Sequence, residues 1–121
     1  MPAEIKGLNE ECGVFGVFGA PEANHLAYLG LHTLQHRGQE GAGIVTTDGT
    51  EMYQYRNRGL LAQVFKNQSD LDNLVGDAAI GHVRYATAGR HTLANVQPFL
   101  FRFHDGDVAL AHNGNLTNAV T

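Results

Sequence analysis

Apolar residues recur with strand-like spacing in some segments and with helical spacing in others, which predicts a mixed fold. The run from Cys12 to Phe18 is short, apolar and rich in β-branched and aromatic residues, as expected of a buried strand. Between Ala23 and Gln35, leucine and alanine recur at helical spacing, and Gly38 is a suitable stop signal. Pro21 and Glu22 suit the turn before this helix and its N-terminus.

The middle and end of the chain carry strand patterns bounded by turn residues. Gly43 to Thr47 and Glu51 to Arg56 flank an Asp-Gly pair that begins at Asp48, which predicts a β-hairpin. Further strands are predicted at Ala78 to Arg84, Gln97 to Phe103 and Val108 to His112. The order of these elements favours an α+β domain in layers with an antiparallel sheet.

Two short helices and one long loop complete the predicted elements. The helices are expected at Leu60 to Phe65 and at Ser69 to Leu74, with Ser69 and Asp70 capping the second. The segment from Tyr85 to Val96 is rich in Gly, Thr, Asn and His and lacks a long apolar run. We therefore expect it to form a functional loop.

Composition excludes several classes of function. The chain has 121 residues, of which 43% are hydrophobic and 17% charged, as is typical of one soluble globular domain. The net charge of -4 and the scattered basic residues argue against a nucleic-acid partner. No apolar run is long enough to span a membrane, and the polar start is unlike a signal peptide. A single cysteine excludes an intrachain disulfide, so we expect a cytoplasmic location.

The single cysteine, Cys12, is the first candidate for chemistry. A lone cysteine is more commonly a small buried hydrophobe. However, Cys12 opens a core strand and follows a polar leader, Met1 to Glu11. If the leader is removed, the free α-amine, with a pKa of about 8, can accept the thiol proton.

Two further motifs offer groups that could act on a substrate. Arg84 ends a predicted strand and opens a loop, a position from which it could bind a carboxylate with two hydrogen bonds. Asn113 and Gly114 offer one side-chain and one backbone N–H, the donors that an oxyanion hole needs. Each also has an ordinary interpretation: a surface arginine at a strand edge, and an Asn-Gly hairpin turn.

The seven histidines do not form a convincing metal site. His32 and His36 have the i, i+4 spacing, but they fall at a helix end, where imidazoles also cap carbonyl groups. We therefore expect no metal in this segment.

Five ordered motifs carry a family resemblance: CGVFGVF (12–18), LQHRGQEGAGI (34–44), GHVRYATAG (81–89), NVQPF (95–99) and LAHNGNL (110–116). From about Ile5 onward, the chain resembles the glutaminase domain of the amidophosphoribosyltransferases, which are N-terminal-nucleophile, or class II, glutamine amidotransferases. The resemblance implies an αββα sandwich of antiparallel sheets, of which this chain is expected to carry only the N-terminal part. It also implies a propeptide at residues 1–11 and the front of the glutaminase domain at residues 12–121, with the phosphoribosyltransferase domain absent.

The resemblance also implies roles for individual residues. Cys12 corresponds to the nucleophile, and Arg84 to the residue that holds the α-carboxylate of glutamine. Residues from Arg84 to about Asn95 resemble the loop that closes over the substrate. The remaining roles are an oxyanion hole from Asn113 and Gly114, loop residues Tyr85 and Thr87 lining the site, and Arg37 and Gly38 bordering the pocket.

The reaction that this implies is hydrolysis of glutamine to glutamate and ammonia, with the ammonia passed to phosphoribosyl pyrophosphate. The product would be phosphoribosylamine, made in the first step of de novo purine biosynthesis. The substrate partners are glutamine and, through the absent domain, phosphoribosyl pyrophosphate. Magnesium and, as a further option, an iron–sulfur cluster are expected only in the full-length enzyme, which is also expected to form a homo-oligomer.

Three alternatives stay open. The family holds the glutamine α-amine with an aspartate beyond the HNGN motif, and the chain ends before that point, so it could be an inactive fragment or an interaction piece. Another class II enzyme such as glucosamine-6-phosphate synthase is the second alternative, although a tryptophan commonly follows the arginine there and this chain has none. A simple Cys/His hydrolase is the third.

Overall fold

The computed structural model describes residues 13–34, 39–85 and 96–111. Along the chain the elements are β1 (Gly13–Phe18), α2 (Ala23–Leu34), β2 (Gln39–Thr47), β3 (Met52–Arg58), α3 (Leu61–Val64), α4 (Gln68–Asp72), β4 (Ala78–Tyr85), β5 (Phe99–Phe103) and β6 (Gly106–Leu110). No helix within these three ranges is long and apolar enough to cross a membrane.

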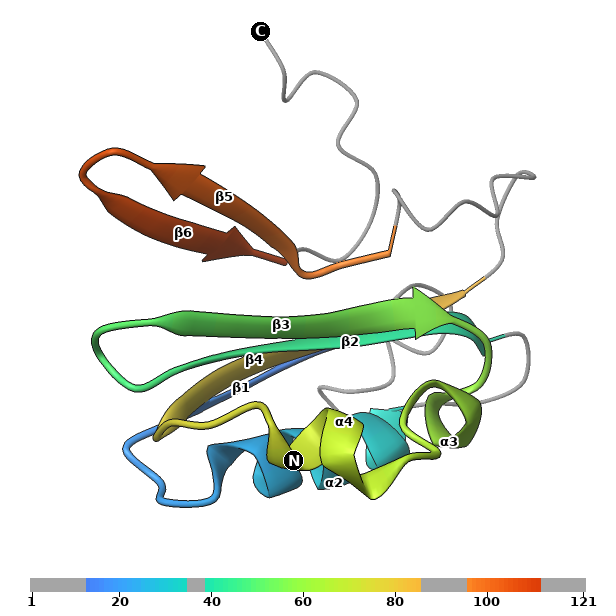
Figure 1. Ribbon diagram of the computed structural model, residues 1–121. Helices are drawn as coiled ribbons and strands as arrows, with labels where there is room; N and C mark the ends of the chain where they lie inside the picture. The colour runs from blue at the N-terminus through green and yellow to red at the C-terminus, as the bar shows by residue number, and fades with distance from the viewer. Residues whose placement is uncertain (1–12, 35–38, 86–95, 112–121) are drawn as a thin grey trace, which may run out of the picture.

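Strands β1 to β4 form one antiparallel sheet in the order β1-β4-β2-β3, so β4 and β2 occupy its centre. The three helices cover one face of this sheet, and the β5–β6 hairpin lies over the other face (Figure 1). The α+β class and the antiparallel sheet are therefore confirmed.

The face toward the helices holds the hydrophobic core. In α2, Ala27 and Leu31 are fully buried and Leu34 nearly so, whereas Leu26 and Leu29 point outward. The helical spacing is thus confirmed, but the packing stripe runs through the alanine and the later leucines. From the other elements the core adds Ala42, Ile44, Leu61, Val64, Phe65, Leu71, Leu74, Ala79 and Val83.

The predicted hairpin is present and longer than the pattern indicated. Its turn is held by Asp48, whose carboxylate accepts hydrogen bonds from the N–H groups of Thr50 and Glu51 at 2.9 and 2.8 Å. The Glu51 bond and then the Thr50 bond lower the pKa of Asp48. Gly49 has φ +95°, a conformation that glycine adopts without strain. Strand β2 begins at Gln39, earlier than expected, because it pairs with β4 before it pairs with β3.

Three local predictions are wrong. Asn67 occupies the N-cap of α4 with extended backbone and no side-chain cap bond, so Ser69 and Asp70 lie inside the helix. Strand β6 begins at Gly106 and not at Val108, because a tight turn brings Gly106 opposite the end of β5. Tyr85 is not a loop residue, because it pairs with Gln39 as the last residue of β4.

Candidate functional site

Two of the predicted site residues, Arg84 and Tyr85, lie in the part of the chain that the structure describes. The others lie outside it: Cys12, Arg37, Gly38, Thr87, Asn113 and Gly114. Their roles stay predictions, and the geometry of the site comes from the residues next to them and from the end of strand β4.

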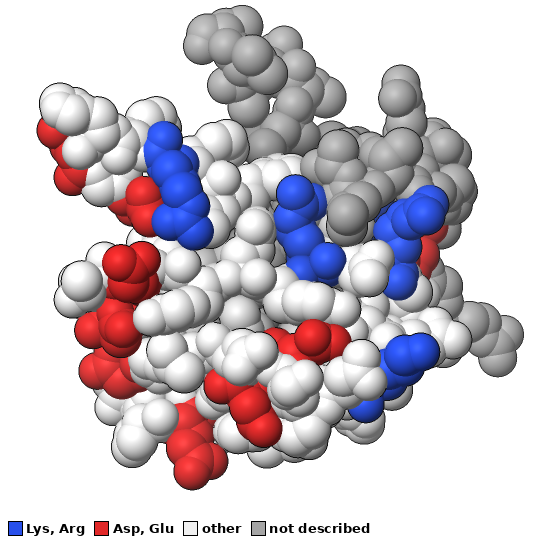
Figure 2. Space-filling view, viewed as in Figure 1, with Lys and Arg blue, Asp and Glu red and all other residues white. Residues whose placement is uncertain are grey.

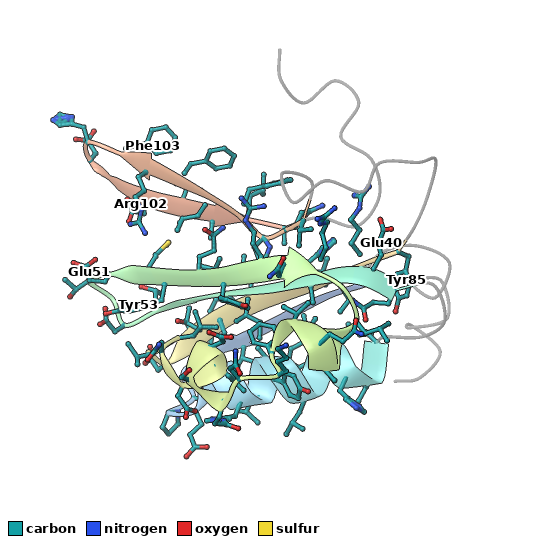
Figure 3. All side chains as sticks on the ribbon, turned by 45° about the vertical axis from the view of Figure 1, so that its right-hand side comes forward. Glu40, Glu51, Tyr53, Tyr85, Arg102 and Phe103 are labelled. Carbon is teal, nitrogen blue, oxygen red and sulfur yellow. The ribbon has the colours of Figure 1, made fainter. Side chains whose placement is uncertain are left out.

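One end of the central sheet brings together the described residues that adjoin these motifs. Gly13, which follows Cys12 in the chain, pairs with Val83. Gln39, which follows Gly38, pairs with Tyr85. Three separate sequence motifs therefore border the same sheet end, which Figure 3 marks with Glu40 and Tyr85.

Arg84 forms an ion pair at this end of the sheet. Its Nε donates to Oε2 of Glu40 at 3.1 Å, and only 15% of the Arg84 side chain and 18% of the Glu40 side chain are exposed. Strand β4 lies between β1 and β2, so the interpretation of Arg84 as a surface arginine at a strand edge is wrong. A guanidinium held in this way is a preorganised donor for a carboxylate.

Glu40 is a residue of this site to which the sequence interpretation assigned no role. It stands in a β-bulge: Gln39 pairs with Tyr85 and Gly41 with Arg84, so Glu40 is an extra residue between two consecutive pairs. The signal available in the sequence was an acidic residue inside the LQHRGQEGAGI motif. The bulge itself depends on strand pairing, which no local pattern reveals.

Tyr85 has its hydroxyl group on the helix-covered side. The hydroxyl donates to the carbonyl of Leu34 at 2.6 Å, and the residue is 5% exposed. This bond ties Tyr85, the last residue of β4, to Leu34, the last residue of α2. The predicted contact of Tyr85 with substrate stays a prediction.

The segment Val96 to Pro98 lies over the sheet face opposite the helices. A Cβ atom at Gly43 would stand 2.3 Å from the carbonyl oxygen of Gln97, so only glycine allows this approach. Arg56 donates to the carbonyl of Val96 at 2.9 Å and Gln54 to that of Pro98 at 3.0 Å. The chain that follows the predicted loop is therefore clamped onto the same face that carries Arg84.

Charge is unevenly distributed over the molecule. In Figure 2, acidic side chains gather on the left of the visible face, and basic side chains run across its upper part toward the right. Among the described residues, no three His, Asp or Glu side chains come together in a way that could hold a metal ion. The described part of the site contains the Arg84–Glu40 ion pair and the backbone of the Val96–Pro98 segment.

Comparison with known proteins identifies the family. Residues 28–121 match the class-II glutamine amidotransferases. The chain belongs to this family. Strand β4, the Arg84–Glu40 pair and the Val96–Pro98 segment all lie within the matched region.

Two relatives of this class-II glutamine amidotransferase chain match it over all or nearly all of its length. It is 62% identical over 121 residues to an amidophosphoribosyltransferase of Lacticaseibacillus casei, covering 100% of this chain and 62% of the relative. It is 61% identical over 120 residues to that of Bacillus subtilis strain 168, covering 98% of this chain and 25% of the relative. The chain thus spans between a quarter and about three fifths of these two proteins.

Solved structures support the fold. The structure described as the allosteric regulatory enzyme of purine biosynthesis matches with a TM-score of 0.80 and 57% identity, over 88% of this chain and 23% of that chain. The glutamine phosphoribosylpyrophosphate amidotransferase of B. subtilis complexed with ADP and GMP matches with a TM-score of 0.77 and 54% identity, over 88% and 22%. At this level of identity, the class-II chain has the same N-terminal-nucleophile fold as these two structures.

Proposed function

We propose that this chain provides the front part of the glutaminase domain of an amidophosphoribosyltransferase. In this proposal Cys12 hydrolyses glutamine to glutamate and ammonia, and the ammonia reacts with phosphoribosyl pyrophosphate to give phosphoribosylamine. Family membership and the names of the relatives support this reaction. Residues 1–11 are the propeptide, and residues 12–121 are the front of the glutaminase domain.

The observation that carries the proposal is the placement of Arg84. Its guanidinium is largely buried and held by Glu40 on a central strand, at the sheet end where β1 begins next to Cys12. A buried arginine with a fixed direction binds a carboxylate through parallel N–H···O bonds. Arg84 therefore holds the α-carboxylate of glutamine, with the side-chain amide extended toward Cys12.

The first chemical step is attack by the Cys12 sulfur on the amide carbon of glutamine. The free α-amine of Cys12 takes the thiol proton, and the new C–S bond places negative charge on the former carbonyl oxygen. The side-chain N–H of Asn113 and the backbone N–H of Gly114 stabilise this oxyanion. The C–N bond then breaks, and ammonia leaves with the proton from the α-ammonium group.

The second step regenerates the enzyme. A water molecule attacks the thioester carbon, its proton passes to the α-amine, and the C–S bond breaks to release glutamate and the thiol. Thr87, Tyr85, Arg37 and Gly38 border the substrate in this scheme. Because the base is the α-amine of Cys12 itself, removal of Met1 to Glu11 is a condition for activity.

The remaining features belong to the complete enzyme. Phosphoribosyl pyrophosphate, magnesium and any iron–sulfur cluster would bind outside the residues of this chain. A cytoplasmic homo-oligomer is the form in which we expect the enzyme to act. No step above depends on a metal.

The test is covalent labelling of the complete gene product with a diazoketone analogue of glutamine, followed by mass spectrometry of the N-terminal peptide. We expect a chain that begins at Cys12 and carries one adduct on it, with none in a Cys12→Ala variant. A folded wild-type sample that keeps Met1 and still hydrolyses glutamine would overturn the mechanism. Glutamine-dependent release of pyrophosphate from phosphoribosyl pyrophosphate tests the acceptor separately.

A further inference from the structure

We infer that Glu40 is a positioning residue for glutamine binding, which it serves by fixing the direction of the Arg84 guanidinium. This inference rests on the proposed function, in which Arg84 binds the α-carboxylate. It adds a residue whose contact with substrate is indirect, through the 3.1 Å bond from Nε of Arg84 to Oε2 of Glu40.

Glu40 lies at a β-bulge in the pairing of β2 with β4. In a regular ladder the residue between Gln39 and Gly41 would have its own partner on β4, but here Arg84 and Tyr85 are consecutive and Glu40 is inserted. Bulges of this kind redirect one side chain and are common beside active sites. The insertion brings the Glu40 carboxylate onto the guanidinium of Arg84.

The bulge is held rigidly by its neighbour Gln39. The Gln39 amide nitrogen donates to the carbonyls of Gly41 and Gly59, both at 2.8 Å, and its oxygen accepts from the N–H of Leu61 at 2.8 Å. Gln39 is 5% exposed, so these bonds are shielded from water. The N–H of Gly59 also donates to the carbonyl of Glu40 at 2.6 Å. The main chain that carries the carboxylate is therefore fixed on both sides.

The chemistry of arginine explains how the bond from Glu40 acts. The guanidinium is planar, so holding Nε fixes the plane and the direction of the two terminal nitrogens. Loss of Glu40 would remove this constraint on Nε, and glutamine binding would then have to restore the direction of the guanidinium. We therefore expect Glu40 to act on substrate affinity more than on the chemical steps.

Steady-state glutaminase kinetics of Glu40 variants in the complete gene product test this inference. Glu40→Ala should raise KM for glutamine about tenfold, with kcat changed by less than about threefold, and Glu40→Asp should restore part of the affinity. Glu40→Gln keeps the shape of the side chain but loses its charge, so it should fold like wild type and give an intermediate KM. Glu51→Gln, which removes an exposed carboxylate at the far end of the sheet in Figure 3, is the matched control and should leave KM unchanged.

A double-mutant cycle separates positioning from a structural role. In an Arg84→Ala background, Glu40→Ala should change KM no further, because the group that it orients is gone. Equal effects of Glu40→Ala with and without Arg84, or a folded Glu40→Gln protein with unchanged KM, would overturn the inference. Wild-type protein that takes no label on Cys12 would instead refute the proposed function, so the two failures are distinguishable.

Discussion

The two faces of the four-stranded sheet differ in almost every physical respect. The face under the helices is closed by apolar side chains, with Leu31, Ile44 and Val83 fully buried. The opposite face carries Arg84 and Arg56, and it is approached by backbone at Gly43. The same strands supply both faces, because side chains alternate along each strand.

This difference implies that neighbouring residues of one strand serve different purposes, one the stability of the fold and the next the binding of substrate. In β4, Val83 belongs to the hydrophobic core and its neighbour Arg84 makes an ion pair with Glu40. A change at one position should alter mainly the free energy of unfolding, and a change at the next mainly glutamine binding. Four pairs of variants test this separation.

The largest effect is expected in the helix-covered core. Leu31→Ala should lower the free energy of unfolding by about 3 kcal/mol, because Leu31 is fully buried and its loss leaves a cavity. Leu29→Ala, on the same helix but 59% exposed, should cost less than about 1 kcal/mol. Chemical denaturation measures both, and equal losses would contradict the assigned packing of α2.

The second pair of variants concerns the two arginines that pair with Gly41 of β2 on its two sides. These are Arg84 on β4 and the exposed Arg58 on β3. Arg84→Ala should raise KM for glutamine about a hundredfold, because a charge-assisted contact is lost. Arg58→Ala should change it less than about twofold. Steady-state kinetics of the complete gene product decide, and similar effects of the two variants would remove the special role of Arg84.

The close approach of the Val96–Pro98 segment is tested by adding one methyl group. Gly43→Ala should cost about 2 kcal/mol, because the new Cβ would meet the Gln97 carbonyl and force the backbone apart. At Gly16 the nearest atom to an added Cβ is 3.4 Å away, on the flexible side chain of Phe18. Gly16→Ala should therefore be nearly neutral, and a neutral Gly43→Ala would show that the segment is not clamped there.

The smallest effect concerns the Tyr85 hydroxyl. Tyr85→Phe should cost about 1 kcal/mol, because the Leu34 carbonyl loses its partner in a buried site. Tyr53→Phe removes a longer, exposed bond of 3.3 Å to Asp48 and should cost almost nothing. Thermal unfolding measures the loss of stability in each variant. A larger loss in Tyr53→Phe than in Tyr85→Phe would contradict the burial of the Tyr85 bond.

Much of the fold could be predicted because it depends on local pattern. The α2 helix, the hairpin around Asp48 and strand β4 follow from periodicity and turn residues. The β5–β6 turn was missed because the strand pattern put the start of β6 at Val108, whereas Gly106 with its positive φ is already opposite Phe103. The predicted cap of α4 was wrong because Asn67, two residues earlier than Ser69, occupies the N-cap position.

The candidate site was predicted less completely. Arg84 was identified from its motif, and its position on a central strand strengthens that choice. Glu40 received no role, because its meeting with Arg84 joins residues 44 positions apart through a bulge. Gly43 was likewise unexplained until the Gln97 carbonyl was found against it. Contacts of this kind depend on the pairing of distant strands, which a single sequence does not show.

The central claim is that Arg84 selects glutamine for Cys12, and protection from labelling tests it most directly. The rate at which the diazoketone analogue modifies Cys12 would be measured over a range of glutamine concentrations. Glutamine should protect the wild-type protein, and Arg84→Ala should need about a hundredfold more glutamine for the same protection. Equal protection of both proteins at equal glutamine concentration would contradict the account.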